Sequence, residues 1–271
     1  MTSPADGFPW AEALPEFTRE APGRCRAKLD RSWWSWSGPH GGLLAALLLR
    51  TAGELAGPDR VPRALSVQFL TAPPEGQVEL TAEVLRDGGS SSVVRATLVA
   101  AGETTTTATL TSARHRARAG TYSMVPAPNV PGPADCASMQ LPVEAVPFSG
   151  HLDYRPATPG LPLSGGDVAE LVAWVRLKDG GSYDPAALVV LTDVMPPALY
   201  AATTVPVPIP TVELSVVLHH GPHATGWVLT RIATRTSADG WCVDDSEVWD
   251  ADGRLLAQAR QVRRLLGDPI R

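Results

Sequence analysis

The sequence predicts an α+β fold in which two antiparallel, curved sheets each wrap around one long apolar helix. The same order of strand-like and helix-like segments occurs twice along the 271 residues, and a proline-rich segment separates the two copies. One segment in each copy is apolar nearly all round, and such a helix must be buried on all sides. We therefore expect an N-terminal half (1–119), a linker (120–147) and a C-terminal half (148–271).

The N-terminal half begins with a segment, 24–36, whose alternation of residues is typical of a strand. A helix is predicted over 37–56, because Ser37 can cap it and its leucine and alanine run strongly favours helix. Four further segments, divided by turn-forming residues, are strand-like: 64–70, 77–88, 91–103 and 105–116.

The C-terminal half repeats this order. Strands are predicted over 149–156 and 170–178, and then a helix over 186–202, because Asp184 followed by Pro185 is typical of a helix start. Four more strand-like segments follow, at 211–220, 225–236, 241–250 and 254–266. The two halves could pair sheet edge to sheet edge, which would remove their exposed edges.

Composition excludes several classes of function. The net charge of −5 argues against nucleic acid as the main partner, because phosphate binding requires a basic face. There is no apolar run long enough to predict a membrane span. Residues 1–17 lack the basic and apolar regions of a secretory signal, and the three cysteines have no paired spacing. These features favour a cytoplasmic protein without a cofactor or a metal site.

One acidic residue stands out within an apolar run. Asp193 lies in the segment VVLTDVMPP (189–197), inside the predicted second helix. A carboxylate in such a setting is costly unless it is hydrogen-bonded, paired with a cation or used in function. We therefore regard Asp193 as a candidate functional residue.

Five segments resemble the acyl-CoA thioesterase II family and its actinobacterial thioesterase-like relatives. They are HGGLLAALLLR (40–50), LSVQFLTAPPEGQVEL (65–80), LTDVMPPAL (191–199), PTVELSVVLH (210–219) and DGRLLAQARQV (252–262). The resemblance extends over most of residues 20–268. It implies a double hotdog fold, hydrolysis of a thioester of coenzyme A or of an acyl carrier protein, a role in lipid metabolism, and assembly into a homo-oligomer.

The resemblance also implies a catalytic set. Asp193 matches the family's aspartate, Thr211 its threonine and Gln261 its glutamine, and together they would activate a water molecule. The prolines between Asp193 and Thr211 leave other candidates for the hydroxyl, namely Thr203, Thr204 and Ser215.

Each of the three also has a purely structural interpretation. Asp193 could lie on an exposed stripe of its helix, and Thr211 could cap a strand. Gln261 alternates with Ala259 and Arg263, so it could face solvent.

Substrate-binding residues are expected before the first helix. Gly41 and Gly42 would let a substrate carbonyl approach backbone N–H groups at a helix N-terminus, although they could serve packing only. His40 could touch substrate or cap the helix. On a strand, Trp34 and Trp36 would point the same way, either to wall an acyl pocket or to seal the core.

Other polar clusters are weaker candidates. The histidines of HHGPH (219–223) match no metal-binding motif, and Asp244, Asp245 and Glu247 are typical of a solvated strand face. The basic residues at 114–118 could meet the phosphates of coenzyme A or simply face solvent.

Two other functions compete with a thioesterase. The first is a non-hydrolytic hotdog enzyme, such as a dehydratase or a cyclase, but no histidine–carboxylate pair is evident on the helix. The second is a silent acyl-binding module, which would have to bury three polar residues without use.

Overall fold

The computed structural model describes residues 16–114, 122–178, 183–219 and 225–267. In the N-terminal half these residues form β1 (Phe17–Ala21), β2 (Arg24–Leu29), α1 (Gly41–Gly53), β3 (Arg60–Phe69), β4 (Gly76–Asp87), β5 (Ser91–Ala100) and β6 (Glu103–Arg114). In the C-terminal half they form β7 (Leu152–Pro156), β8 (Glu170–Leu177), α2 (Pro185–Leu191), β9 (Thr211–Leu218), β10 (Val228–Ala238), β11 (Trp241–Trp249) and β12 (Leu255–Arg264). The predicted repeat of strands, one helix and four strands is therefore confirmed.

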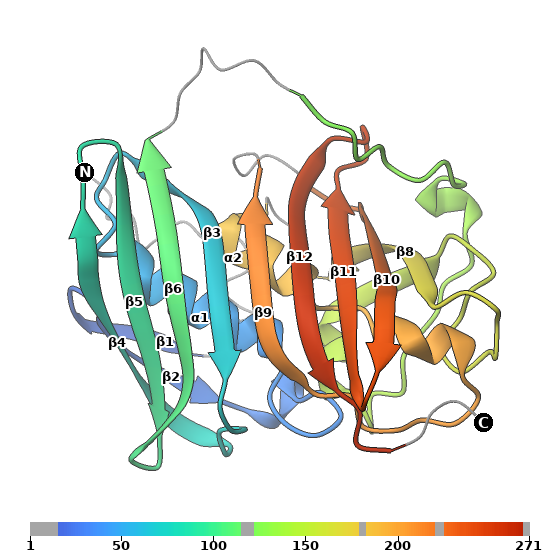
Figure 1. The fold of residues 1–271 in the computed structure, drawn as a ribbon, viewed down its shortest axis with the longest axis horizontal. Coiled ribbons are helices and arrows are strands. Elements are labelled where there is room, and N and C mark those ends of the chain that lie inside the picture. Colours follow the sequence, from blue (N-terminus) through green and yellow to red (C-terminus); the bar gives the residue numbers. More distant parts are fainter. Residues whose placement is uncertain (1–15, 115–121, 179–182, 220–224, 268–271) are drawn as a thin grey trace.

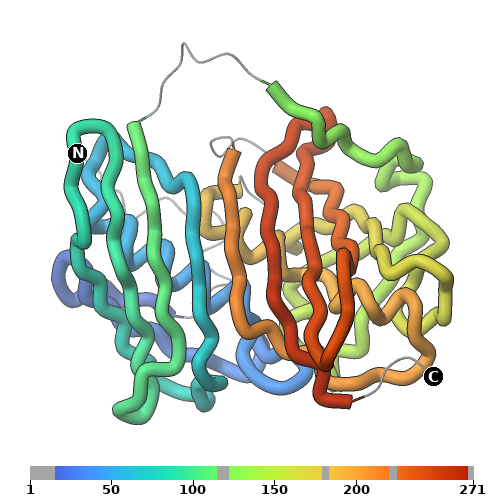
Figure 2. Tube along the Cα trace, in the orientation of Figure 1, coloured from blue at the N-terminus to red at the C-terminus, as the bar shows by residue number. Residues whose placement is uncertain are grey.

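All strands of the described residues join one antiparallel sheet, in the order β1-β2-β4-β5-β6-β3-β9-β12-β11-β10-β8-β7. The α+β class is confirmed. The sheets of the two halves join edge to edge, as the sequence suggested, because β3 pairs with β9 and makes one continuous sheet. Figure 1 shows these two strands side by side at the middle of the sheet, with both helices behind it. The tube in Figure 2 shows the same junction between the cyan and orange strands.

Helix α1 is buried on nearly all sides, as its sequence predicts. It begins at Gly41, and its N-cap is His40 rather than Ser37. The Nδ1 atom of His40 accepts a hydrogen bond from the N–H of Leu43 at 3.1 Å. This contact satisfies one of the donors that a helix start leaves unpaired.

Helix α2 is shorter than the sequence predicts. It ends at Leu191, Thr192 caps it, and a separate 3₁₀ turn follows at Ala198–Ala202. Pro196 and Pro197 account for the break, because proline lacks the N–H that a continuing helix requires and its ring clashes with the preceding turn. Asp193 therefore lies just after the helix and not within it.

The strand predicted over 24–36 ends at Leu29. Asp30 accepts a hydrogen bond from the N–H of Ser32 and caps a 3₁₀ turn at Arg31–Trp33. The turn rotates the chain out of strand geometry, so the predicted alternation of the tryptophans is wrong. Trp34 is buried in the core, whereas Trp36 is 47% exposed.

The main hydrophobic core is shared by the two halves. It includes residues of α1 and α2 together with the inner faces of strands from both halves. The described part of the linker packs against the C-terminal half. The indole N–H groups of Trp174 and Trp249 donate to the linker carbonyls of Pro131 and Val125, respectively. None of the helices formed by the described residues is long and apolar enough to cross a membrane.

Candidate active site

A cavity of about 450 Å³ lies where the two halves meet. Its walls come from the chain before α1, the end of β3, the linker, the turn after α2, and the adjacent ends of β9 and β12. Most lining residues are apolar, and the charged side chains among them are Asp193, Arg263 and Arg264. The cavity is therefore an apolar chamber with its charge concentrated at one wall.

Asp193 belongs to this wall and is held by the opposite half. Its Oδ2 atom accepts a hydrogen bond of 2.7 Å from the N–H of Gly42, in the first turn of α1. That N–H is one of the unpaired donors of the helix start, where the helix dipole also favours negative charge. The carboxylate is thus fixed by backbone geometry rather than left on an exposed helix stripe.

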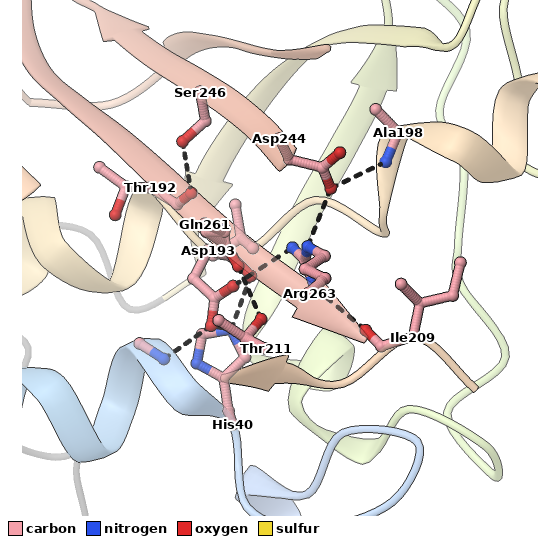
Figure 3. A network of polar contacts seen from close by, with 12 residues as sticks. His40, Thr192, Asp193, Ala198, Ile209, Thr211, Asp244, Ser246, Gln261 and Arg263 are labelled. Atoms are coloured by element: carbon pink, nitrogen blue, oxygen red, sulfur yellow. Dashed lines mark hydrogen bonds and ion pairs between the residues drawn. The ribbon is translucent and has the colours of Figure 1, made fainter. Parts of the chain in front are cut away.

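Thr211 and Gln261 lie beside Asp193 (Figure 3). The hydroxyl of Thr211, the first residue of β9, donates to Oε1 of Gln261 in β12 at 2.8 Å. Gln261 is fully buried, so the interpretation that it faces solvent is wrong. Its Nε2 atom has no hydrogen-bond partner among the described residues. Thr211 lines the cavity, and none of its alternatives, Thr203, Thr204 and Ser215, does.

His40 both caps α1 and contacts Asp193. Because its Nδ1 accepts from Leu43, the proton of the neutral ring is on Nε2, which donates to the backbone carbonyl of Asp193 at 2.9 Å. Nε2 also lies 3.6 Å from Oδ2 of Asp193. Burial lowers the pKa of His40, and the charge of Asp193 only partly offsets this effect. The ring is therefore neutral near pH 7, with both nitrogens engaged.

Side chains from three elements hold the backbone around Asp193. The carbonyl of Thr192 accepts from Ser246 at 2.8 Å, that of Asp193 from His40, and that of Val194 from Tyr154 at 3.0 Å. Burial, together with the charge of Asp193, raises the pKa of Tyr154 well above its usual range. Its hydroxyl therefore stays protonated as a donor. We call these three contacts the carbonyl clamp.

Sequence reasoning missed a buried ion pair beside Asp193, formed by Arg263 on β12 and Asp244 on β11. Arg263 is buried, and its Nη2 atom lies 3.8 Å from Oδ1 of Asp193. Its Nε atom lies 2.8 Å from Oδ2 of Asp244, which is fully buried. The prediction that Asp244 lies on a solvated face is therefore wrong, and it is wrong for Glu247 too, which is buried and paired with Arg231.

The two-residue period of the strands could have identified these buried residues. Asp244 alternates with Cys242 and Ser246, all of them buried, and Arg263 alternates with Gln261. In contrast, Asp245 points the other way and pairs with Arg235 and Arg260.

Only some of the remaining residues that the sequence singled out lie at the cavity. Trp36 and Gly41 line the cavity, whereas Trp34 does not. His219 bonds to Gln258, and Arg114 pairs with Asp59. The other members of these two clusters, His220, His223, His115, Arg116 and Arg118, lie outside the described residues. Within the described ranges, no group of three or more His, Cys, Asp or Glu side chains is arranged to hold a metal ion.

Several solved structures are similar to nearly the whole chain. A hot dog fold protein of unknown function from Alicyclobacillus acidocaldarius is 26% identical, with a TM-score of 0.83 over 93% of this chain and 96% of that one. A protein assigned as a thioesterase II from Thermobifida fusca is 28% identical, with a TM-score of 0.82 over 95% and 97%. A protein assigned as a thioesterase from Novosphingobium aromaticivorans is 27% identical, with a TM-score of 0.81 over 94% and 100%.

Comparison with protein families gives the same assignment. The sequence profile of the acyl-CoA thioesterase N-terminal domain matches residues 30–113, and that of the acyl-CoA thioesterase C-terminal domain matches residues 133–264. No curated protein matches the sequence significantly. Because the two profiles match in order and span the two halves that enclose the cavity, the chain belongs to the acyl-CoA thioesterase family and is a thioester hydrolase of the hot dog fold.

Proposed function

We propose that this protein hydrolyses acyl-CoA thioesters with apolar acyl groups, by a water molecule that Asp193 activates. One observation carries the proposal: Asp193, Thr211 and the start of α1 line one wall of a mostly apolar cavity, and Gln261 is hydrogen-bonded to Thr211. The family assignment supports thioester hydrolysis, and the roles of individual residues are part of this proposal.

Each group at this wall has a task in the reaction. The N–H of Gly42 donates a hydrogen bond to Oδ2 of Asp193, so Oδ1 is the oxygen available to take a proton from water. The water oxygen attacks the thioester carbonyl carbon, and the C–S bond breaks as the tetrahedral intermediate collapses. The departing sulfur takes the proton back from Asp193 and leaves as a thiol, and the other product is the carboxylic acid. The Nε2 atom of Gln261 and the hydroxyl of Thr211 are suited to orient that water.

The start of α1 is suited to stabilise the oxyanion. Gly41 is the first residue of the helix and lines the cavity. Its N–H is therefore placed among the unpaired donors of the first turn, on the positive end of the helix dipole. We propose that this N–H donates a hydrogen bond to the carbonyl oxygen of the substrate and stabilises the negative charge that develops there. Because Gly42 already bonds to Asp193, the two glycines have separate roles.

The cavity walls favour a neutral acyl group. Half-exposed Trp36 and the aromatic ring of Phe69 stand beside prolines such as Pro39 and Pro197, which makes the walls apolar and stiff. His40 contributes no charge, since its ring is neutral. Coenzyme A is the preferred carrier on family grounds, and an acyl carrier protein is the alternative.

The wider organisation belongs to the same proposal. We assign residues 1–119 and 148–271 to two hotdog units of a double hotdog, with 120–147 as their linker. A cytoplasmic homo-oligomer that acts in lipid metabolism is the expected setting.

The geometry of His40 disfavours a dehydratase or cyclase. His40 does lie next to a carboxylate, which is the pairing that those reactions require. However, one of its nitrogens caps α1 and the other donates to a backbone carbonyl. A ring held in this way is not free to exchange protons with a substrate.

The test is thiol release from a panel of short, medium and long acyl-CoA esters, and of matching acyl carrier protein esters. We expect Asp193→Asn to reduce kcat by at least roughly 100-fold, the size expected for a general base. The control is Asp135→Asn, an exposed carboxylate in the linker, which should leave kcat unchanged. Full activity of Asp193→Asn would refute the assigned mechanism. A folded wild type that cleaves no ester would favour the acyl-binding alternative.

A further inference from the structure

The cavity wall that carries Asp193 also contains a buried cation, Arg263, that the proposed reaction does not use directly. We propose that Arg263 is a positioning residue for Asp193, and that Asp244 holds Arg263 in place. This inference rests on the proposed role of Asp193 as general base.

The burial of Arg263 and Asp244 requires an explanation. Arg263 lies on β12 and Asp244 on β11, and both side chains point inward from the sheet. Removing two charges from water costs several kcal/mol per ion, which their mutual attraction often fails to recover. A buried pair is therefore a poor source of stability by itself, and its position against the site suggests a functional reason.

Arg263 uses each end of its guanidinium for a different neighbour. Nε is in ion-pair contact with Asp244, Nη1 donates to the carbonyl of Ile209 at 3.5 Å, and Nη2 faces Oδ1 of Asp193 at 3.8 Å. Figure 3 shows this side chain between the two carboxylates. Nη2 has no hydrogen-bond partner among the described residues. Only a planar fork can span both carboxylates at once.

Asp244 is in turn anchored from two sides. Its Oδ1 accepts from the hydroxyl of Thr234 at 2.7 Å, and its Oδ2 accepts from the N–H of Ala198 at 3.4 Å. Ala198 begins the 3₁₀ turn that follows the Asp193 segment. Asp244 therefore ties the cation to the same stretch of chain that carries Asp193.

The resulting arrangement fixes the carboxylate without blocking it. The N–H of Gly42 sets the position of Oδ2, and the cation attracts Oδ1 from the other side, so rotation about the carboxyl group is restricted. At 3.8 Å the Nη2–Oδ1 contact is too long for a hydrogen bond, so Oδ1 remains able to accept a proton from water. Asp244 is required because it keeps Arg263 from closing onto Asp193.

Arg263 also lines the cavity, so a substrate-binding role is the competing interpretation. Kinetics distinguish the two roles. Loss of a positioning residue lowers kcat with KM unchanged, whereas loss of a substrate contact made equally in ground and transition states raises KM.

The experiment compares Arg263→Ala, Arg263→Lys and Asp244→Asn with wild type on the best acyl-CoA ester. We expect Arg263→Ala to lower kcat roughly 10- to 100-fold, because a small misplacement of a reacting group has effects of this size. Its KM should stay within about threefold. Guanidinium ion at a non-denaturing concentration should restore part of the activity of Arg263→Ala, and it should do nothing for Asp193→Asn or for wild type.

Arg263→Lys covers the case in which Arg263→Ala does not fold. Lysine keeps the charge but cannot reach both carboxylates, so we expect kcat to fall at least about fivefold while the circular dichroism spectrum is preserved. Asp244→Asn should reduce kcat in the same direction.

Three results would overturn the proposal: wild-type kcat in Arg263→Lys, a change in KM alone, or loss of thermal stability without loss of kcat. If Asp193→Asn is inactive while Arg263→Lys is fully active, only this inference fails. If Asp193→Asn is itself fully active, the proposed role of Asp193 fails together with this inference.

Discussion

Gly42 is a residue of the N-terminal half that lies tightly against Asp193 and Val190 of the C-terminal half. A Cβ atom there would lie 2.8 Å from Cε1 of His40, 3.0 Å from Cβ of Asp193 and 3.2 Å from Cα of Val190. The last of these is backbone of α2 and cannot rotate away. Only glycine therefore allows its N–H to reach the carboxylate.

Replacing Gly42 tests this close approach. We expect Gly42→Ala to lower the free energy of unfolding by about 1–3 kcal/mol through overpacking. It should also lower kcat, because the added carbon pushes Asp193 away from its donor. The matched control is Gly53→Ala at the other end of α1, where no heavy atom lies within 4 Å of the new Cβ. Urea denaturation and thiol release measure both effects, and equal behaviour of the two variants would contradict the argument.

His40 makes stability depend on pH. Its folded pKa is lowered, chiefly by burial, whereas in the unfolded chain it titrates near 6.5. The unfolded state therefore binds the proton first, and stability falls as the pH drops below about 6.5. The contribution is fully present above that pH. Its environment includes Asp193 and Arg263, whose charges act in opposite directions on the ring.

We expect His40→Asn to flatten this dependence. Asparagine is a good N-cap and does not titrate, so it can keep the bond to Leu43 without the proton linkage. Melting temperatures measured from pH 7.5 to 5.0 should fall less steeply in the variant than in wild type. Parallel curves would show that other groups cause the acid sensitivity.

Residue type explains which members of the site could be predicted. Asp193 was conspicuous as a charge in an apolar run, and family resemblance supplied Thr211 and Gln261. The sequence predicts a solvated strand face for Asp244 and does not single out Arg263, because charged residues such as these are rarely fully buried. Only the fold reveals that each is the partner that makes the other's burial tolerable.

At the scale of elements, the turn after α2 is the part that positions Asp193, the proposed general base. Consecutive carbonyls at 192, 193 and 194 are each held by a side chain from a different element, which we have called the carbonyl clamp. Without these contacts, a turn that lacks regular hydrogen bonds would not fix the position of Asp193. The clamp replaces the missing helical bonds with bonds from the core.

The clamp can be weakened one donor at a time. Tyr154→Phe leaves the carbonyl of Val194 buried without its donor, which should cost about 1–3 kcal/mol of stability. We expect kcat to fall severalfold as well, because Asp193 is the neighbouring residue. The control is Tyr183→Phe, which removes a similar hydroxyl contact, to the carbonyl of Gly226, away from the cavity. A kcat unchanged in Tyr154→Phe would show that the clamp supports folding only.

Element boundaries were harder to predict than element order. The helix over 186–202 was predicted from its apolar run, yet Pro196 and Pro197 end it early and the actual helix stops at Leu191. Alternation of residues predicts a strand over the whole of 24–36, but it does not reveal that Asp30 caps a 3₁₀ turn and ends the strand. In both places the chain leaves regular structure where it forms the cavity wall.

At the scale of the whole molecule, the proposed active site needs residues from both halves. The N-terminal half supplies Gly42 and His40, and the C-terminal half supplies Asp193, Thr211 and Gln261. Repetition of the pattern in sequence predicted that the sheet edges could pair. It could not predict the register, which depends on contacts between distant residues such as Leu65 opposite Val216 and Val67 opposite Leu214.

This shared sheet and core lead us to expect that the halves unfold together. Leu65 and Leu214 are buried on either side of the β3–β9 junction. Replacing either by alanine should cost about 2–5 kcal/mol and lower a single calorimetric transition, although the two lie in different halves. Val217→Ala on the exposed face of β9 is the control and should change little. Two separated transitions, with each core variant shifting only one, would mean that the halves are independent and that closure of the active site is a docking equilibrium.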